Sequence, residues 1–329
     1  MPPGSRRRLL GIALGALFLC AGPCRAALDL SQDGLLRDHL WNEFLALPQS
    51  RRPVVGVALS AGSARGLAHV GVLQALDDAG FPIDVVAGTS IGSVIGALYA
   101  SGIPAAKEKK LLENVDLGSI ANLGTFSLLR LVISDRLISS RGVAAALNRY
   151  LAGKQFEDLP KRFACVSMDL DSGEAILFRQ GNVGDAVRAS MNLPGVFAPV
   201  EYRQRYLVDG GVVDYIPVDA ARILGAQWVL ASVTEPDYTL ARPKSALQNL
   251  DQVIDIRSSL MADAQEKIAN FVIASGSDGI GTFQFDRASE AADTGIVTAH
   301  KRIGDAEENL ILFALNDIMP DLSAKRPRP

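Results

Sequence analysis

The residues with the clearest chemical potential are Gly88-Thr89-Ser90-Ile91-Gly92, a Gly-x-Ser-x-Gly pattern with one serine between two glycines. The apolar run 83–87 precedes it, and the small-residue run 93–100 follows it. A strand, a tight turn of this kind and a helix form a nucleophile elbow, which projects a serine hydroxyl from a strained turn. Glycines at positions 88 and 92 let the helix pass close to the strand. A motif this short also arises by chance, so an ordinary glycine-rich turn is the alternative that its surroundings must decide.

A second glycine-rich turn, Gly62-Ser63-Ala64-Arg65-Gly66, lies between the apolar run 54–59 and a predicted helix at 67–79. Unpaired N–H groups at a helix N-terminus favour negative charge, so the backbone of Gly62, Ser63, Ala64 and Arg65 is predicted to stabilise an oxyanion. A dinucleotide-binding fingerprint is disfavoured, because Ala61 and Ser63 stand where it requires glycines. Arg65 either adds positive charge to the site or caps the loop.

A serine nucleophile needs a base, and the chain has only three histidines. His39 falls in the predicted N-terminal helix and His300 lies near the predicted C-terminal helices, whereas His69 follows the first turn, where it is expected to pack against the sheet. Asp209 is the better candidate, because it ends a predicted strand and precedes Gly210-Gly211, which allow close approach of the backbone. A carboxylate acting directly on serine needs partial desolvation to raise its basicity. The alternative is that Asp209-Gly210-Gly211 is a plain hairpin turn.

The elements that would position these residues follow in a regular order. Strand 54–59, helix 67–79, strand 83–87 and the helix after the elbow make a βαβα unit, whose right-handed crossover places both turns at the carboxyl ends of neighbouring parallel strands. Further strands are predicted at 163–166, 175–178, 205–208, 228–233 and 271–274, and helices at 29–47, 107–112, 142–151, 187–190, 286–294 and 305–318. Residues 236–250 are predicted to be a surface connection. The apolar stretch 126–133 is interpreted as a buried helix, with contact to substrate or membrane as the alternative.

Composition indicates a globular protein, with 48% hydrophobic and 21% charged residues. Residues 1–26 contain the basic run Arg6-Arg7-Arg8, an apolar stretch at 9–19 and a small-x-small site ending at Ala26, which together predict a signal peptide. The protein is therefore expected to be exported, to the periplasm or outside the cell. The twin-arginine route stays open, and an uncleaved membrane anchor is the alternative.

Cleavage after Ala26 would remove four arginines and no acidic residue, which moves the net charge from −3 to −7. A protein so acidic has no global attraction to nucleic acid, so no nucleic-acid partner is expected. Cys165 would remain as the only cysteine, and it is expected to be buried in a strand. The predicted organisation is a signal peptide (1–26), an N-terminal helical segment (27–52), a catalytic core (53–235), a C-terminal α/β extension packed on the same domain (236–323) and a disordered tail (324–329).

The three motifs, in this order and spacing, resemble those of bacterial patatin-like phospholipases over about residues 53–235, and more loosely around 271–295. The resemblance also includes Arg188-Ala189-Ser190, Leu193-Pro194-Gly195, Ala198-Pro199-Val200 and Ile216-Pro217-Val218. It implies an α/β fold of three α/β/α layers with a mostly parallel central sheet. It further implies a dyad of Ser90 as nucleophile and Asp209 as general base, acting on phospholipids or other acyl-ester lipids without metal or cofactor.

The sequence departs from that family in the oxyanion loop, where relatives commonly have Gly-Gly-Gly or Ser-Gly-Gly in place of Ala61-Gly62-Ser63. The departure bears on rate and substrate fit more than on reaction class. Three hypotheses therefore remain: an exported serine lipid acyl hydrolase with peripheral membrane contact, a catalytically weak lipid-binding or regulatory protein on the same scaffold, and a triad esterase for small soluble esters.

Overall fold

A central β-sheet organises the protein, whose computed structural model describes residues 32–114, 139–234, 242–243, 245–276 and 279–319. The described strands are β1 (Val55–Leu59), β2 (Val85–Thr89), β3 (Arg162–Asp169), β4 (Ala175–Phe178), β5 (Val200–Tyr202), β6 (Arg205–Asp209), β7 (Trp228–Val233) and β8 (Phe271–Ala274). Hydrogen-bonded neighbours run β5-β6-β3-β2-β1-β7-β8, with β4 also on β3. The run from β3 to β8 is parallel, and β4, β5 and β6 pair antiparallel. The expected mostly parallel sheet is confirmed.

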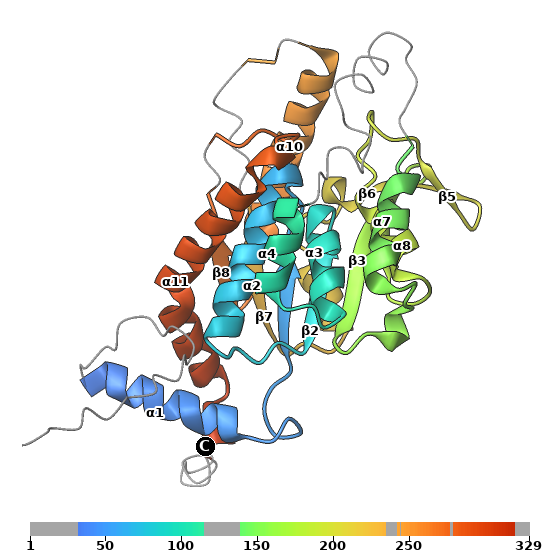
Figure 1. Cartoon of the computed structure of the whole chain (residues 1–329). Coiled ribbons are helices and arrows are strands. Elements are labelled where there is room, and N and C mark those ends of the chain that lie inside the picture. Colours follow the sequence, from blue (N-terminus) through green and yellow to red (C-terminus); the bar gives the residue numbers. More distant parts are fainter. Residues whose placement is uncertain (1–31, 115–138, 235–241, 244, 277–278, 320–329) are drawn as a thin grey trace, which may run out of the picture.

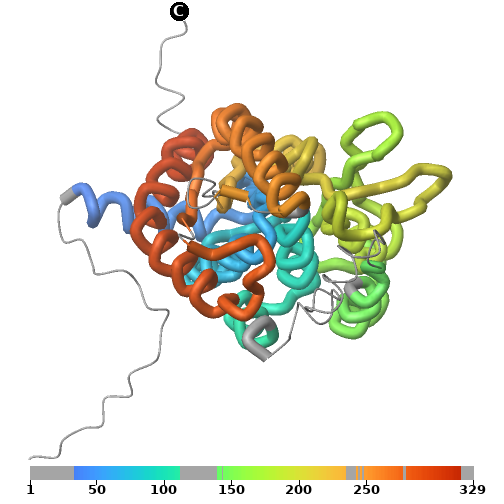
Figure 2. Tube along the Cα trace, turned by 90° about the horizontal axis from the view of Figure 1, so that it is seen from above, coloured from blue at the N-terminus to red at the C-terminus, as the bar shows by residue number. Residues whose placement is uncertain are grey.

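Helices cover both faces of this sheet (Figures 1 and 2). They are α1 (Gln32–Ala46), α2 (Ala68–Asp78), α3 (Ile91–Ala100), α4 (Ala105–Asn114), α7 (Arg141–Leu151), α8 (Val183–Ser190), α9 (Val218–Ile223), α10 (Ala246–Glu266), α11 (Ala288–Phe313) and α12 (Leu315–Ile318). Alternate strand residues face opposite layers. On β1, Val57 and Leu59 join a core with α1, α2, α3 and α11, whereas Ala58 joins a core with α9 and α10. This arrangement gives the three α/β/α layers.

Strand β3 is longer than β2 and brings two distant strands end to end. Thr89 at the end of β2 lies opposite Val166, and Asp209 at the end of β6 lies opposite the next residue, Ser167. Strand β4 overlaps both pairings along β3, so β2 and β6 must share its other edge. Because β2 is parallel to β3 and β6 is antiparallel, their carboxyl ends point toward each other.

Several element boundaries differ from expectation. The predicted helices 286–294 and 305–318 are wrong as separate elements, because one helix, α11, runs through both intervening glycines to Phe313. A Cβ on Gly295 would lie 2.0 Å from the Ala68 carbonyl oxygen, so this glycine serves close packing against α2 rather than a break. Helix α10 begins at Ala246, inside the predicted surface connection 236–250, and the short strand β5 was not predicted.

Some predictions lie outside the described residues: the signal peptide at 1–26, the apolar stretch 126–133 and the tail from 324. Within the ranges that are described, no helix combines the length and apolar character needed to cross a membrane.

Candidate active site

Ser90 occupies the turn between β2 and α3, as the elbow motif predicts. Its backbone has φ 55° and ψ −124°, a conformation that a non-glycine residue adopts only when its surroundings enforce it. Its N–H donates to Ser190 Oγ at 3.0 Å, and Ser190 Oγ donates to the Val166 carbonyl at 2.6 Å. The strained turn is therefore bound to β3 through one hydroxyl. Gly88 lies in β2, and Gly92 lies in the first turn of α3.

The side chain of Ser90 meets that of Asp209. Ser90 Oγ donates to Asp209 Oδ2 at 2.5 Å, and the Gly211 N–H donates to Asp209 Oδ1 at 2.7 Å. Asp209 is 4% exposed, and this burial raises its pKa from 3.8 to about 6, although both hydrogen bonds oppose the shift. Gly210 begins a 3-10 turn, Gly210–Val212, that leads toward α9, so the hairpin-turn alternative is wrong.

The segment Ala61–Gly66 contacts the turns that carry both members of this pair. A Cβ on Gly66 would lie 2.1 Å from Ile91 Cγ2, next to Ser90, and a Cβ on Gly211 would lie 2.9 Å from Ala61 Cβ. Only glycine permits the first approach, and only a local shift would permit the second. The three motifs that are separate in the sequence are thus in mutual contact.

Some of the backbone N–H groups that were predicted to bind the oxyanion have no hydrogen-bond acceptor among the described residues. Ala64 N–H donates to the Thr282 carbonyl at 3.2 Å, so it is already bonded. Within the part of the chain that the structure describes, the N–H groups of Gly62 and Ser63 have no acceptor, whereas Arg65 lies inside the 3-10 turn Ser63–Leu67. Ser63 has φ 50°, so the serine at this position takes the left-handed conformation that glycine adopts more easily. The Arg65 guanidinium pairs with Asp255 of α10.

The histidines do not join this site. His69 is fully buried, and its ring nitrogens lie 2.7 Å from Ser232 Oγ and 3.0 Å from the Ser60 carbonyl. Burial lowers its pKa from 6.5 to about 4, which keeps the ring neutral. His39 lies on α1 and His300 on α11. Cys165 is buried in β3.

Two residues that support the Ser90–Asp209 pair, Ser190 and Asn192, were not predicted from the sequence. Ser190 supports the Ser90 backbone, and the Asn192 carbonyl accepts the Asp209 N–H at 3.0 Å. Arg188-Ala189-Ser190 was the only available signal, as a motif without an assigned role. Among the described residues, no group of three or more His, Cys, Asp or Glu side chains is arranged to hold a metal ion.

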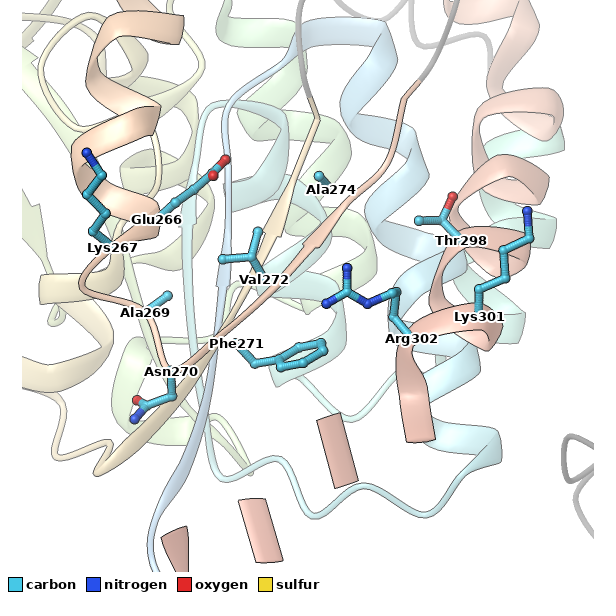
Figure 3. A pocket seen from close by; sticks show the side chains of 10 residues that line it. All are labelled: Glu266, Lys267, Ala269, Asn270, Phe271, Val272, Ala274, Thr298, Lys301 and Arg302. Carbon is cyan, nitrogen blue, oxygen red and sulfur yellow. The ribbon is translucent and has the colours of Figure 1, made fainter. Parts of the chain in front are cut away.

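A separate cavity of about 640 Å³ lies along β8, between the end of α10 and α11 (Figure 3). Its lining includes Phe271, Lys301 and Arg302, and none of the predicted site residues. It is thus distinct from the Ser90–Asp209 pair.

The sequence matches a protein-family model over about half of the chain. The family model described as patatin-like phospholipase matches residues 57–222. An uncharacterized NTE family protein of Mycobacterium tuberculosis is 37% identical over 175 residues, which cover 51% of this chain and 46% of that protein. Human patatin-like phospholipase domain-containing protein 6 is 35% identical over 179 residues, covering 54% of this chain and 13% of the relative. Lysophospholipase NTE1 of Coccidioides immitis is 34% identical over 180 residues, covering 54% and 11%. The chain therefore spans less than half the length of each of these relatives.

Proposed function

The chain belongs to the patatin-like phospholipase family, and on that premise we propose that it is an exported serine lipid acyl hydrolase with a Ser90–Asp209 dyad. The observation that carries the proposal is the 2.5 Å hydrogen bond from Ser90 Oγ to Asp209 Oδ2, formed where both side chains are buried. A carboxylate desolvated in this way is more basic than one in water, and it contacts the proton that it would remove.

The reaction begins when Ser90 Oγ attacks the carbonyl carbon of a fatty-acyl ester and its proton passes to Asp209. The free N–H groups of Gly62 and Ser63, together with the N–H of Arg65, are the donors proposed for the tetrahedral oxyanion. Collapse of this intermediate breaks the ester bond, and the leaving alcohol takes the proton from Asp209. Water then attacks the acyl-enzyme, Asp209 accepts the proton of that water, and the fatty acid leaves as Ser90 regains its hydrogen.

Substitution of each dyad member tests the proposal. Ser90→Ala and Asp209→Asn should each reduce hydrolysis of a p-nitrophenyl acyl ester by at least about 10³-fold, because both groups act in the same step. Ser167→Ala is the matched control, since Ser167 lies opposite Asp209 on β3 and its buried hydroxyl has no partner in the described structure. Wild-type labelling by a fluorophosphonate at Ser90, with retained activity in Ser167→Ala, is the expected result. Activity in Ser90→Ala would sink the proposal.

A lipid-binding protein with weak turnover is the second candidate. It is favoured by one observation: the Ala64 N–H, a predicted oxyanion donor, is already bonded to the Thr282 carbonyl and so does not face the oxyanion. Such a protein would bind lipid without being labelled at Ser90. The triad esterase is disfavoured, because His69 is bonded to Ser60 and Ser232 instead of the dyad. His69→Gln should therefore keep kcat within about threefold of wild type, and loss of activity equal to that of Ser90→Ala would reinstate the triad.

Phospholipids or lysophospholipids are the proposed substrates, by analogy with relatives named phospholipase and lysophospholipase. Incubation with mixed phospholipids and lysophospholipids, with Ser90→Ala as the blank, identifies the lipid consumed and the acyl chain released. Peripheral contact with a membrane belongs to the same proposal. Faster turnover on vesicles than on dispersed short-chain esters would support it.

Export rests on the first 26 residues alone, with Arg6-Arg7-Arg8 before an apolar stretch. Fractionation of the producing cell, with mass measurement of the mature N-terminus, tests it. A protein starting at Ala27 in the periplasm or medium is expected, and a full-length cytoplasmic protein would contradict export.

A further inference from the structure

Helix α10 lies outside the residues 57–222 that match the family model, yet its inner side contacts the candidate site. It packs on the sheet face that carries α9, and Figure 1 shows it near the top of the molecule. Its contacts reach both the Gly62–Gly66 loop and the turn after Asp209. Each contact is polar and each comes from the same side of the helix, from residues spaced three or four apart.

The strongest contact is the ion pair between Arg65 and Asp255. One terminal guanidinium nitrogen of Arg65 donates to both carboxylate oxygens of Asp255, at 2.9 and 3.0 Å. The Arg65 side chain is 6% exposed and that of Asp255 is 18% exposed. A buried guanidinium is costly without a counterion, so Asp255 fixes where this side chain lies. The backbone N–H of Arg65 is also one of the predicted oxyanion donors.

Two weaker contacts extend from the neighbouring turns of α10. Asp251 accepts a hydrogen bond from Thr282 Oγ1 at 2.6 Å, and the Thr282 carbonyl accepts the Ala64 N–H. Ser258 Oγ donates to the Gly211 carbonyl at 3.3 Å, next to the group that binds Asp209. The helix thus holds the loop at two points and the Asp209 turn at a third.

The loop needs such support, because Ser63 has φ 50°, in a region that non-glycine residues rarely occupy. Backbone in such conformations persists only where its surroundings over-determine it. Oxyanion donors are effective when they are held in place before the reaction, and a displacement of about 1 Å can cost about 10²-fold in rate.

We propose that Asp255 is a positioning residue for acyl transfer, which acts through the Arg65 guanidinium to hold the N–H groups of the Gly62–Arg65 loop where the oxyanion forms. This inference rests on the proposed function. It predicts that the Arg65–Asp255 ion pair affects kcat rather than substrate binding, because Asp255 contacts the loop and not the ester.

The test uses the full-length protein and compares Asp255→Asn with wild type. Asp255→Asn should lower kcat on a p-nitrophenyl acyl ester about 10- to 100-fold with KM unchanged within twofold, and slow fluorophosphonate labelling of Ser90 in parallel. Asp84→Asn is the matched control, since Asp84 forms a similarly buried pair with Arg52 at 2.7 Å, at the opposite end of β2. It should lower thermal stability and leave kcat unchanged.

A double variant separates positioning from charge neutralisation. Arg65→Gln with Asp255→Asn removes both charges and so avoids an unpaired buried cation, which keeps the test available if Asp255→Asn alone fails to fold. Positioning predicts that kcat stays low in the double variant, whereas simple neutralisation predicts recovery to the wild-type value. Any of three results would overturn the inference. They are recovery of kcat in the double variant, a folded Asp255→Asn with kcat within twofold of wild type, and an equal kcat loss in Asp84→Asn. If wild type itself neither hydrolyses esters nor is labelled at Ser90, the proposed function fails first and this inference with it.

Discussion

Thr89 and Asp209 pair with adjacent residues of β3, Thr89 with Val166 and Asp209 with Ser167. Ser90, the proposed nucleophile, directly follows Thr89, and Asp209 is the proposed base. Backbone pairing to one shared strand therefore brings together two side chains that lie 119 residues apart. A slip of β6 by one residue would turn Asp209 to the other face of the sheet.

The pH dependence of catalysis should follow Asp209. Only its carboxylate can accept the Ser90 proton, and burial raises the pKa to about 6. We expect kcat/KM to fall tenfold per pH unit below about pH 6 and to be level above it. The pH profile of kcat/KM is measured with a neutral ester. A profile with its midpoint near 3.8, the ordinary pKa of an aspartate, would show that Asp209 is not the base.

Asp209→Asn should stabilise the protein at neutral pH while abolishing its activity. Because the folded-state pKa lies above the unfolded value of 3.8, the folded state binds more protons between pH 3.8 and about 6, and stability falls as pH rises through this window. The shift of about two units corresponds to about 3 kcal/mol, all of it lost above pH 6. Denaturant unfolding should show Asp209→Asn to be more stable than wild type at pH 7.5, with the advantage gone at pH 3.5. An equal difference at both pH values would argue against this origin.

Ser190→Ala should loosen the elbow. Its hydroxyl satisfies both the Ser90 N–H and the Val166 carbonyl, and buried groups left unpaired cost about 1–3 kcal/mol each. We expect a lower unfolding temperature and a kcat reduced about tenfold, measured on the folded fraction. Ser93→Ala is the control, because Ser93 Oγ bonds the Ser90 carbonyl, which keeps its bonds from the Ser93 and Val94 N–H groups. Equal effects of the two substitutions would contradict a special role for Ser190.

Gly66→Ala should displace the oxyanion loop from the elbow. The added Cβ would lie 2.1 Å from Ile91 Cγ2, so one of the two segments must move. We expect a kcat loss of about 10²-fold, partly restored in Gly66→Ala/Ile91→Ala, where the opposing methyl group is absent. No recovery in a folded double variant would show that the glycine serves something other than this contact.

The site was more predictable from the sequence than its surroundings. The elbow, the first loop and the Asp209 turn each follow a strand, so local patterns locate them, and parallel pairing brings the first two to one edge of the sheet. The bounds of β4, β7 and β8 match those predicted, because each is a short apolar run between polar residues.

The remaining features depend on contacts between distant segments. Asp255 lies 190 residues from Arg65, and nothing in the local sequence of α10 marks it as a partner. Gly295 reads as a helix breaker until its packing against Ala68 is known. The Ser63 backbone and the Thr282 bond to Ala64 likewise follow from tertiary packing, which local patterns do not encode.

The shared pairing on β3 also has a consequence for folding. Ser90 and Asp209 meet only after β2, β3 and β6 have associated, which requires closure of long chain segments and therefore comes late in assembly. Before that point Ser90 is an ordinary, unreactive serine. Fluorophosphonate labelling of Ser90 during refolding should therefore report when the sheet is complete. The rate of this labelling does not depend on how early the helices form.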